Sequence, residues 1–370
     1  MKLISSQRKL STAINTVQKA VSSKSTLPLL KGILIQAVDD KIQLVGNDLE
    51  LGIESYIDGQ VIEEGSIVID SKLFGDIIRK LPDSSVVIEV DSDNMIHIKC
   101  ESSDFKIKGH CSDEYPKLPD LDEDRFYEIP EDLFKNMIKQ TVFAISQDET
   151  KPILMGELLE IENNNISLIA IDGYRLAIRS GQIINNIGDI KVIIPGKALN
   201  EINRILSGDE GKNIKVAFTD KHALFLIDET KIITRLLEGE FINYKQLLPK
   251  EYNLRVKVPT KTLLNCIERT SLLAKEGKNN LVKFSIRDDI MIATSNSEIG
   301  NVQEEIFITL EGEDLDIAFN SRYLIEGLKV IESEEIYIEF TTNVSPCIVK
   351  PEDGIKYIYL LLPVRISSSR

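Results

Sequence analysis

GSIVIDSKLFGDIIRKLPDSSVVIEV, the stretch from Gly65 to Val90, sets a short amphipathic helix between two segments with the apolar patterning of β-strands. The same pattern returns twice later in the chain, as IKVIIPGKALNEINRIL from Ile190 and as LDIAFNSRYLIEGLKVI from Leu315. One basic residue heads each copy, at equal intervals along the chain: Lys72, Lys197 and Arg322. Equal spacing of a matched pattern indicates an internal repeat.

A second helical stripe precedes each copy. Its residues are spaced i, i+4, i+7 and i+11, as on the buried face of an amphipathic helix. In the three copies they are Leu10, Ile14, Val17 and Val21, then Phe134, Ile138, Thr141 and Ile145, and then Leu263, Ile267, Thr270 and Ala274. The three stripes predict one further helix in each repeat.

Pairs of apolar runs joined by Asp or Asn lie between the helices: ILIQAV-DD-KIQLVG, LLEIE-NNN-ISLIAI and VKFSI-RDD-IMIATS. Such pairs are typical of β-hairpins. The sequence therefore predicts an α+β fold of three tandem copies of one unit, each with two helices packed on antiparallel sheet. Boundaries near PDLDEDR (119–125) and KEYNLR (250–255) give expected domains at residues 1–122, 123–253 and 254–370.

The predicted helices together carry a net positive charge, although the whole chain carries −15. In each repeat two basic residues lie two helical turns apart, which places both on one face. These pairs are Lys72 with Arg79, Lys197 with Arg204, and Arg322 with Lys329. They predict a basic band that contacts nucleic-acid phosphates without reading bases. The alternative is that these residues only solvate the helices.

Composition and motifs disfavour several other classes of protein. No apolar run approaches the roughly 20 residues of a membrane span, and the start, MKLISSQRKL, lacks the apolar block of a secretory signal, so we expect a cytoplasmic protein. Neither the adjacent His110 and Cys111 nor SQDE (146–149) makes a convincing metal site. Phosphate-loop, GxGxxG, HExxH and GxSxG motifs do not occur in the sequence. We therefore expect no cofactor, no metal and no catalysis.

Six segments together resemble the beta sliding clamp family of bacterial DNA polymerase III. They are STLPLLKGI (25–33), DETKPILMG (148–156), AIDGYRLAI (170–178), FINYKQLLP (241–249), SEIGNVQEEI (297–306) and YLLLPVR (359–365). The resemblance implies a non-catalytic homodimer in which each chain forms half of a ring, with helices lining a hole for double-stranded DNA. It implies a processivity role at the nucleoid, with a clamp loader, the replicative DNA polymerase alpha subunit, and repair and translesion proteins as partners.

The resemblance also assigns residues to three surfaces. A hydrophobic cleft that binds QLxLF-type peptides is expected between the second and third domains, at Leu154, Ile171, Gly173, Tyr174, Arg175, Leu176, Ile242, Leu247, Leu360, Leu362, Pro363, Val364 and Arg365. Ile171 and Ile242 stand where the best-known members have Thr and Pro. A dimer interface is expected where Phe105 and Ile107 meet Leu272 and Leu273 of the partner subunit. The residues expected near DNA are Lys24, Lys72, Arg79, Lys151 and Lys197, to which the charge pattern adds Arg204.

Two other functions remain open from the residues alone. A β-rich scaffold that binds peptides would share the cleft but would not associate with DNA. A nuclease or other DNA hydrolase would need an acidic cluster and a divalent metal. Neither function accounts for a threefold repeat whose helices are basic in an acidic chain.

Overall fold

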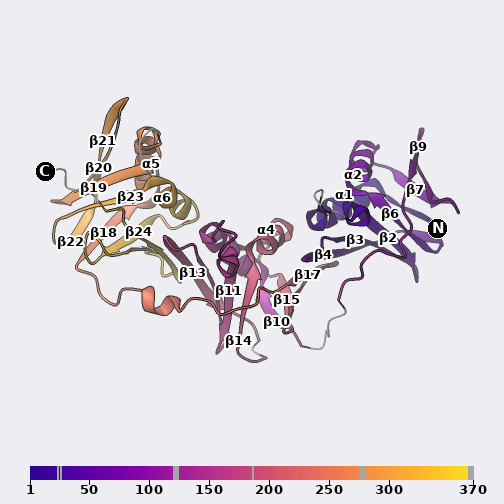
Figure 1. Ribbon diagram of the computed structural model, residues 1–370, viewed down its shortest axis with the longest axis horizontal. Coiled ribbons are helices and arrows are strands. Elements are labelled where there is room, and N and C mark those ends of the chain that lie inside the picture. Colours follow the sequence, from indigo (N-terminus) through magenta and orange to yellow (C-terminus); the bar gives the residue numbers. More distant parts are fainter. Residues whose placement is uncertain (23–24, 26, 120–124, 186, 276–279, 366–370) are drawn as a thin grey trace. The chain divides into compact units, whose positions relative to one another are not determined.

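A computed structural model describes residues 1–22, 25, 27–119, 125–185, 187–275 and 280–365 (Figure 1). The chain forms two compact units. Unit 1 comprises Met1–Asp132 with Glu201–Leu236, and unit 2 comprises Leu133–Asn200 with Leu237–Arg370. The middle repeat therefore contributes strands to both units, as the following sheets show.

Unit 1 holds two antiparallel sheets. The eight-stranded sheet runs in the order β10-β15-β16-β17-β4-β3-β2-β6, and the five-stranded sheet in the order β5-β1-β7-β8-β9. Their strands are β1 (Lys2–Ser6), β2 (Gly32–Val38), β3 (Lys41–Asn47), β4 (Leu51–Ile57), β5 (Gln60–Glu63), β6 (Gly65–Asp70), β7 (Ser85–Val90), β8 (Met95–Cys100), β9 (Ser103–Lys108), β10 (Tyr127–Pro130), β15 (Asn213–Phe218), β16 (His222–Ile227) and β17 (Thr230–Arg235). Helices α1 (Gln7–Val17) and α2 (Ser71–Lys80) pack against each other. Because β4 pairs with β17, the larger sheet continues from the first repeat into the second.

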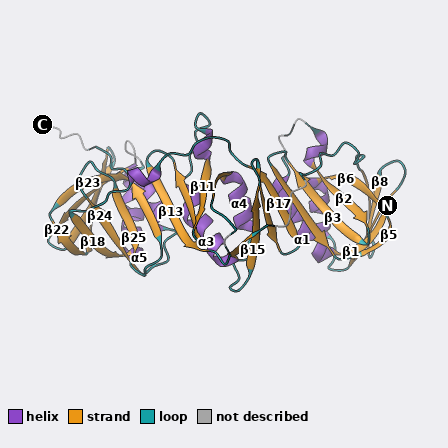
Figure 2. Ribbon diagram, turned by 90° about the horizontal axis from the view of Figure 1, so that it is seen from below, coloured by secondary structure: helices purple, strands orange, loops and turns teal. Residues whose placement is uncertain are grey.

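Unit 2 is built in the same way (Figure 2). A nine-stranded sheet runs in the order β14-β11-β12-β13-β26-β25-β24-β18-β22, and a four-stranded sheet in the order β21-β20-β19-β23. Their strands are β11 (Gly156–Glu162), β12 (Asn165–Ile171), β13 (Arg175–Gln182), β14 (Ile190–Pro195), β18 (Leu254–Pro259), β19 (Leu281–Arg287), β20 (Ile290–Ser297), β21 (Gly300–Phe307), β22 (Thr309–Gly312), β23 (Leu315–Asn320), β24 (Glu335–Phe340), β25 (Cys347–Pro351) and β26 (Tyr357–Leu361). The described residues also form the α-helices α3 (Glu131–Thr141), α4 (Gly196–Ile205), α5 (Thr260–Ala274) and α6 (Ser321–Leu328).

The three predicted hairpins are confirmed, down to the backbone of their turns. Strand pairs β2–β3, β11–β12 and β19–β20 are each joined by two residues with positive φ. These are Asp39 and Asp40 (φ 49° and 57°), Asn163 and Asn164 (47° and 66°), and Asp288 and Asp289 (48° and 58°). Two consecutive positive φ values define the tight hairpin turn whose twist matches that of the strands, and Asp and Asn tolerate this conformation.

The predicted helices are confirmed, but two of them end early. Helix α1 stops at Val17 and continues as a short 3-10 segment, so that Val21 has an extended backbone. Helix α3 stops at Thr141 and likewise passes through a 3-10 turn, and Ile145 follows it as a buried, extended residue. The helical spacing predicted longer helices because the residues after the helix ends are also apolar and half-buried or buried.

Glu157 on β11 is a fully buried carboxyl in unit 2. Burial raises the pKa of Glu157 to about 8. The Thr141 hydroxyl lies 2.8 Å from the Met137 carbonyl oxygen and 2.5 Å from Glu157 Oε2. The hydroxyl has one proton, so it can donate only one of these two hydrogen bonds. If Thr141 donates to the Met137 carbonyl oxygen, it accepts the other hydrogen bond from the protonated carboxyl of Glu157. The geometry therefore fits a neutral Glu157.

A neutral buried Glu157 makes the stability of unit 2 depend on pH. Unfolded glutamate loses its proton at its ordinary pKa, near 4.5, whereas folded Glu157 keeps it to about pH 8. The contribution of Glu157 to the free energy of unfolding is therefore fully present below its pKa in the unfolded chain. It is lost as the pH rises through its pKa in the folded protein. From about pH 6 to 7.5 the wild type should lose about 2 kcal/mol more unfolding free energy than Glu157→Gln.

Denaturant unfolding at both pH values tests this expectation. Glu162→Gln is the matched control, because Glu162 lies on the same strand but is exposed. This control should follow the wild type. If the free energy of unfolding changed equally with pH in the wild type and in Glu157→Gln, Glu157 would be ionised already in the folded protein.

Candidate peptide, dimer and DNA surfaces

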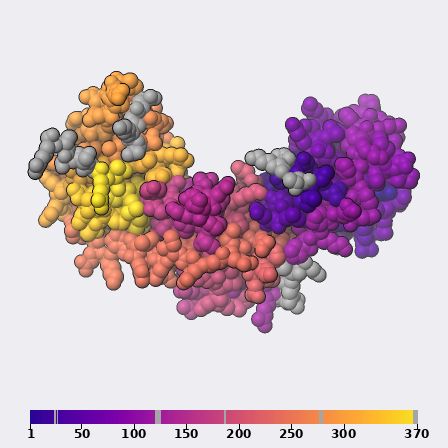
Figure 3. Space-filling view, viewed as in Figure 1, coloured from indigo at the N-terminus to yellow at the C-terminus, as the bar shows by residue number. Residues whose placement is uncertain are grey.

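Strands β13 and β26 join the second and third repeats within unit 2. Their antiparallel register sets Leu176 opposite Leu360. Just beyond β26, the Leu362 N–H donates to the Tyr174 carbonyl oxygen at 2.9 Å. Figure 3 shows the yellow C-terminal residues beside magenta residues of the second repeat. Two segments far apart in sequence, both predicted to line the peptide cleft, are thus brought together.

Eight apolar residues of the predicted cleft make up a set that we call the junction patch. Four are buried, with 7% exposure or less, and share one apolar cluster: Leu154, Ile171, Leu176 and Leu360. Four are exposed, at 39% to 61%: Tyr174, Ile242, Leu247 and Leu362. Buried leucines beneath exposed leucine, isoleucine and tyrosine side chains suit an apolar peptide anchor.

The remaining predicted cleft residues have mixed surroundings. Gly173 has φ +98°, and a Cβ added there would meet no heavy atom within 4 Å. Pro363 and Val364 are half-buried, and the Val364 N–H donates to the Ala318 carbonyl oxygen at 2.8 Å. Arg365 is exposed. The segment after β26 is therefore fixed to the third repeat by its backbone.

Arg175, predicted as a cleft residue, is a buried cross-link within unit 2 and has only 6% exposure. Its guanidinium pairs with Asp172 at 2.9 Å and with Glu326, and it donates to the Phe143 carbonyl oxygen at 2.7 Å. It also lies 4.5 Å from the centre of the Tyr323 ring. Burial acts to lower the pKa of Arg175, but neighbouring acidic groups outweigh it and raise that pKa. Arg175 therefore positions the turn that carries Tyr174, and its predicted contact with a peptide stays a prediction.

Sequence reasoning missed two aromatic residues that hold the segment before β18. Phe241 and Tyr244 are buried in the apolar cluster of the junction patch. The Tyr244 hydroxyl donates to Glu160 Oε2 at 2.6 Å, and burial with this carboxylate raises the pKa of Tyr244. The two aromatics anchor the segment that carries two members of the junction patch, Ile242 and Leu247. The only signal in the sequence was their spacing within FINYKQLLP.

The four predicted dimer residues lie on or beside open sheet edges. Phe105 (39% exposed) and Ile107 are on β9, the last strand of its sheet in unit 1. Leu272 (65% exposed) and Leu273 are on α5, which packs against the edge strand β21 in unit 2. Phe307, at the end of β21, is 85% exposed and was not predicted. Open edges flanked by exposed apolar side chains favour pairing with another chain.

The residues predicted near DNA differ in exposure and in the ion pairs that they form. Lys72 and Lys197 are exposed, whereas Lys24 lies outside the described residues. The Arg79 guanidinium is bound to Asp76 at 2.8 Å and to Asn15 at 2.9 Å. The other ion pairs of these basic residues are Lys151 with Asp148 (3.9 Å), Arg204 with Glu201 (2.7 Å), Arg322 with Glu326 (2.8 Å) and Lys329 with Glu268 (2.8 Å). The basic band is therefore weaker than the formal charges indicated.

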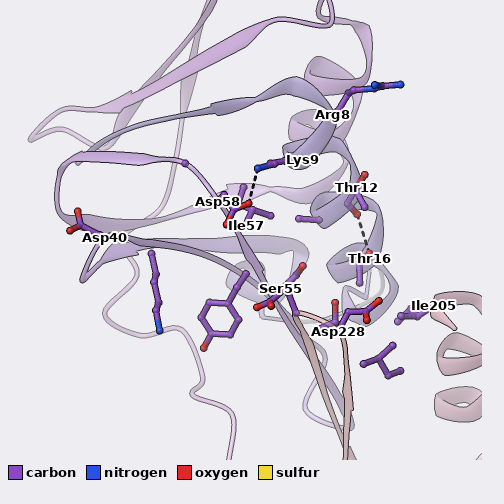
Figure 4. A pocket seen from close by; sticks show the side chains of 17 residues that line it. Arg8, Lys9, Thr12, Thr16, Asp40, Ser55, Ile57, Asp58, Ile205 and Asp228 are labelled. Atoms are coloured by element: carbon purple, nitrogen blue, oxygen red, sulfur yellow. Dashed lines mark hydrogen bonds and ion pairs between the residues drawn. The ribbon is translucent and has the colours of Figure 1, made fainter. Parts of the chain in front are cut away.

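A pocket of about 830 Å³ in unit 1 contains none of the predicted site residues (Figure 4). Helix α1 lines one side with Arg8, Lys9 and Thr12, and Asp58 lies next to Lys9. Lys9 pairs with Asp58 at 2.7 Å. Because Asp40, Asp58, Asp228 and Glu229 all line it, the pocket offers phosphates no net attraction.

The described ranges contain no group of three or more His, Cys, Asp or Glu side chains arranged to hold a metal ion. Within the same residues, no helix is both long and apolar enough to cross a membrane.

Comparison with known proteins identifies the family. Models of the DNA polymerase III beta subunit match in order along the chain: the N-terminal domain at residues 1–119, the central domain at 128–243 and the C-terminal domain at 245–365. The beta sliding clamp of Bacillus subtilis is 37% identical, covering 99% of this chain and 100% of that protein. The beta sliding clamp of Halalkalibacterium halodurans is 38% identical, covering 95% of this chain and 96% of that protein.

A solved structure supports the same assignment. The DNA polymerase sliding clamp from Bacillus subtilis superposes with a TM-score of 0.96 at 37% identity, covering 99% of each chain. The threefold repeat, the α+β architecture and these full-length matches agree. The chain therefore belongs to the DNA polymerase III beta subunit family, the beta sliding clamps.

Proposed function

We propose that two copies of this chain close head to tail into a ring around duplex DNA and act as a non-catalytic sliding clamp. The observation that carries this proposal is the pair of open, apolar edges, β9 with Phe105 and β21 with Phe307. When one edge of a subunit contacts a different edge of the next subunit, the contact can repeat from subunit to subunit. The subunits form a closed ring if the rotations that relate them add up to a full turn. The three repeats, taken as domains 1–122, 123–253 and 254–370, would supply half of that ring.

DNA contact is proposed to be weak and independent of base sequence. Exposed basic side chains such as Lys72 meet phosphates, while the acidic partners of Arg79 and Arg204 lower the net positive charge around them. Partial neutralisation suits a protein that must slide, because each phosphate contact adds a salt-dependent affinity that opposes movement. Association with DNA places the protein in the cytoplasm, at the nucleoid.

The junction patch is proposed to tether other proteins to the ring. Its exposed members, Leu247, Leu362 and Tyr174, offer apolar contacts for the leucine and phenylalanine anchors of a QLxLF-type peptide. The replicative polymerase alpha subunit, the clamp loader, and repair and translesion proteins are the proposed carriers of such peptides. A single patch per chain would let different partners compete for it.

Ring closure can be tested at the proposed interface. Replacing both Leu272 and Leu273 with Ala should weaken the dimer about a hundredfold, because each truncation of an apolar anchor costs roughly 1.4 kcal/mol. Solution mass measured down to nanomolar concentration reports the change. Ile184→Ala with Val344→Ala is the matched control, because both side chains are exposed and apolar and neither residue belongs to β9, α5 or β21. A Leu272/Leu273 variant that stays dimeric at nanomolar concentration would place the interface elsewhere.

A further inference from the structure

The junction of the first and second repeats, within unit 1, has the same construction as the junction patch in unit 2. Strand β4 pairs with β17 as β13 pairs with β26, and Gly52 lies opposite Ile233 as Leu176 lies opposite Leu360. An aspartate forms the turn before each of these strands. Asp48 Oδ1 accepts from the Leu51 N–H at 2.8 Å, and Asp172 Oδ1 accepts from the Arg175 N–H at 3.1 Å. The two junctions are therefore equivalent positions of the repeat.

The segments at the ends of the first and second repeats also correspond to each other. Tyr115 and Tyr244 are both buried, and each is followed three residues later by a leucine, Leu118 or Leu247. Leu247 is 41% exposed and belongs to the junction patch. Leu118 is half-buried and packs on two apolar clusters. One cluster contains Leu34, Val45, Val68 and Tyr115, and the other contains Ala217, Leu224 and Ile233.

A single substitution between the repeats accounts for this difference. Leu176 fills its place in the second junction and has 0% exposure. The equivalent Gly52 has no side chain, and a Cβ built there would lie 2.2 Å from Leu118 Cδ2. The Leu118 side chain thus fills the space that glycine leaves open. At the first junction the chain supplies its own leucine anchor.

Hydrogen bonds hold the segment that carries Leu118 in place. The Tyr115 hydroxyl donates to the Val45 carbonyl oxygen at 3.3 Å. Asn47 Nδ2 donates to the Pro116 carbonyl oxygen at 3.1 Å. A groove commonly binds an extended peptide by hydrogen bonds to its backbone and by an apolar pocket for an anchor side chain. Here both the hydrogen bonds and the anchor come from the same chain.

We propose that the first junction is a second leucine-accepting peptide site, kept closed by the chain's own Leu118. The ligand class rests on the function proposed for the junction patch: a short linear peptide with a leucine anchor. Removing the Leu118 side chain leaves an apolar space floored by Gly52 and walled by Val45 and Ile233. With Leu118 present, the full-length protein exposes only the junction patch to such a peptide.

Peptide titration of the full chain tests this proposal. A labelled QLxLF-type peptide should bind once per chain to the wild type and twice per chain to Leu118→Ala. Leu118→Met, which refills the space, is the matched control and should bind once. Replacing the peptide leucine with alanine should weaken binding to the new site about thirtyfold. Hydrogen exchange should place the second peptide on β4 and β17.

The outcomes separate this proposal from the one on which it rests. If the wild type binds no peptide but Leu118→Ala binds one on β4 and β17, the function of the junction patch fails and the second site stands. Leu118→Val, a smaller truncation of the same side chain, serves as a second opening variant. If Leu118→Ala and Leu118→Val both bind only as much peptide as the wild type, the second site is wrong. Loss of the folded unit 1 in Leu118→Val would also overturn it, because an occupant of a peptide site is dispensable for folding.

Discussion

Deleting residues 362–370 will weaken binding of a QLxLF-type peptide about a thousandfold. Leu362 is an exposed member of the junction patch, and Pro363 follows it on the same segment. Loss of two anchors at roughly 2 kcal/mol each corresponds to about three orders of magnitude in affinity. Strand β26 ends at Leu361, so its pairing with β13 stays complete in the truncated chain.

Peptide titration and solution mass, measured on the same preparation, check this result. A shorter deletion of residues 366–370 is the matched control, because it spares every predicted cleft residue up to Arg365. The control should bind peptide as the full chain does, and both proteins should remain dimeric. Normal peptide binding by the longer deletion, or its dissociation to monomers, would show that the C-terminal segment is not a wall of the cleft.

Arg175→Ala will destabilise unit 2 by about 3–5 kcal/mol, the usual cost of removing one partner from a buried ion pair. The substitution leaves the carboxylates of Asp172 and Glu326 without their shared buried cation. It also removes the hydrogen bond to the Phe143 carbonyl oxygen. Denaturant unfolding measures the loss.

Arg322→Ala is the control for Arg175, because Arg322 pairs with the same Glu326 from an exposed position. A surface pair of this kind contributes at most about 1 kcal/mol. Equal effects of the two substitutions would mean that Arg175 is no more than a surface charge. A peptide-contact role alone would predict normal stability with weakened binding.

The features that sequence predicted best are those fixed by neighbouring residues. Consecutive Asp or Asn residues between apolar runs determine the hairpin turns, because few other residues accept two positive φ values. Helical spacing placed the helices, although it carried α1 past its end to Val21. Repetition at equal intervals predicted the α+β repeat, which the family comparison confirms.

Features that depend on distant residues escaped prediction. The charge pattern did not predict that the Arg79 guanidinium also binds Asn15 on helix α1. Arg175 was assigned to the cleft by resemblance, and its burial depends on Glu326 from another repeat. The packing of Leu118 on Gly52 likewise needs β4 to be placed beside the segment after Tyr115.

Encirclement of DNA is the central claim, and retention on DNA of different topology tests it most directly. The protein, placed on nicked circular DNA by a clamp loader, should stay bound through gel filtration and should leave when the circle is cut once. Weak phosphate contacts alone cannot retain it, since they exchange freely with salt. Equal retention on circular and linear DNA would contradict a sliding ring and indicate ordinary surface binding.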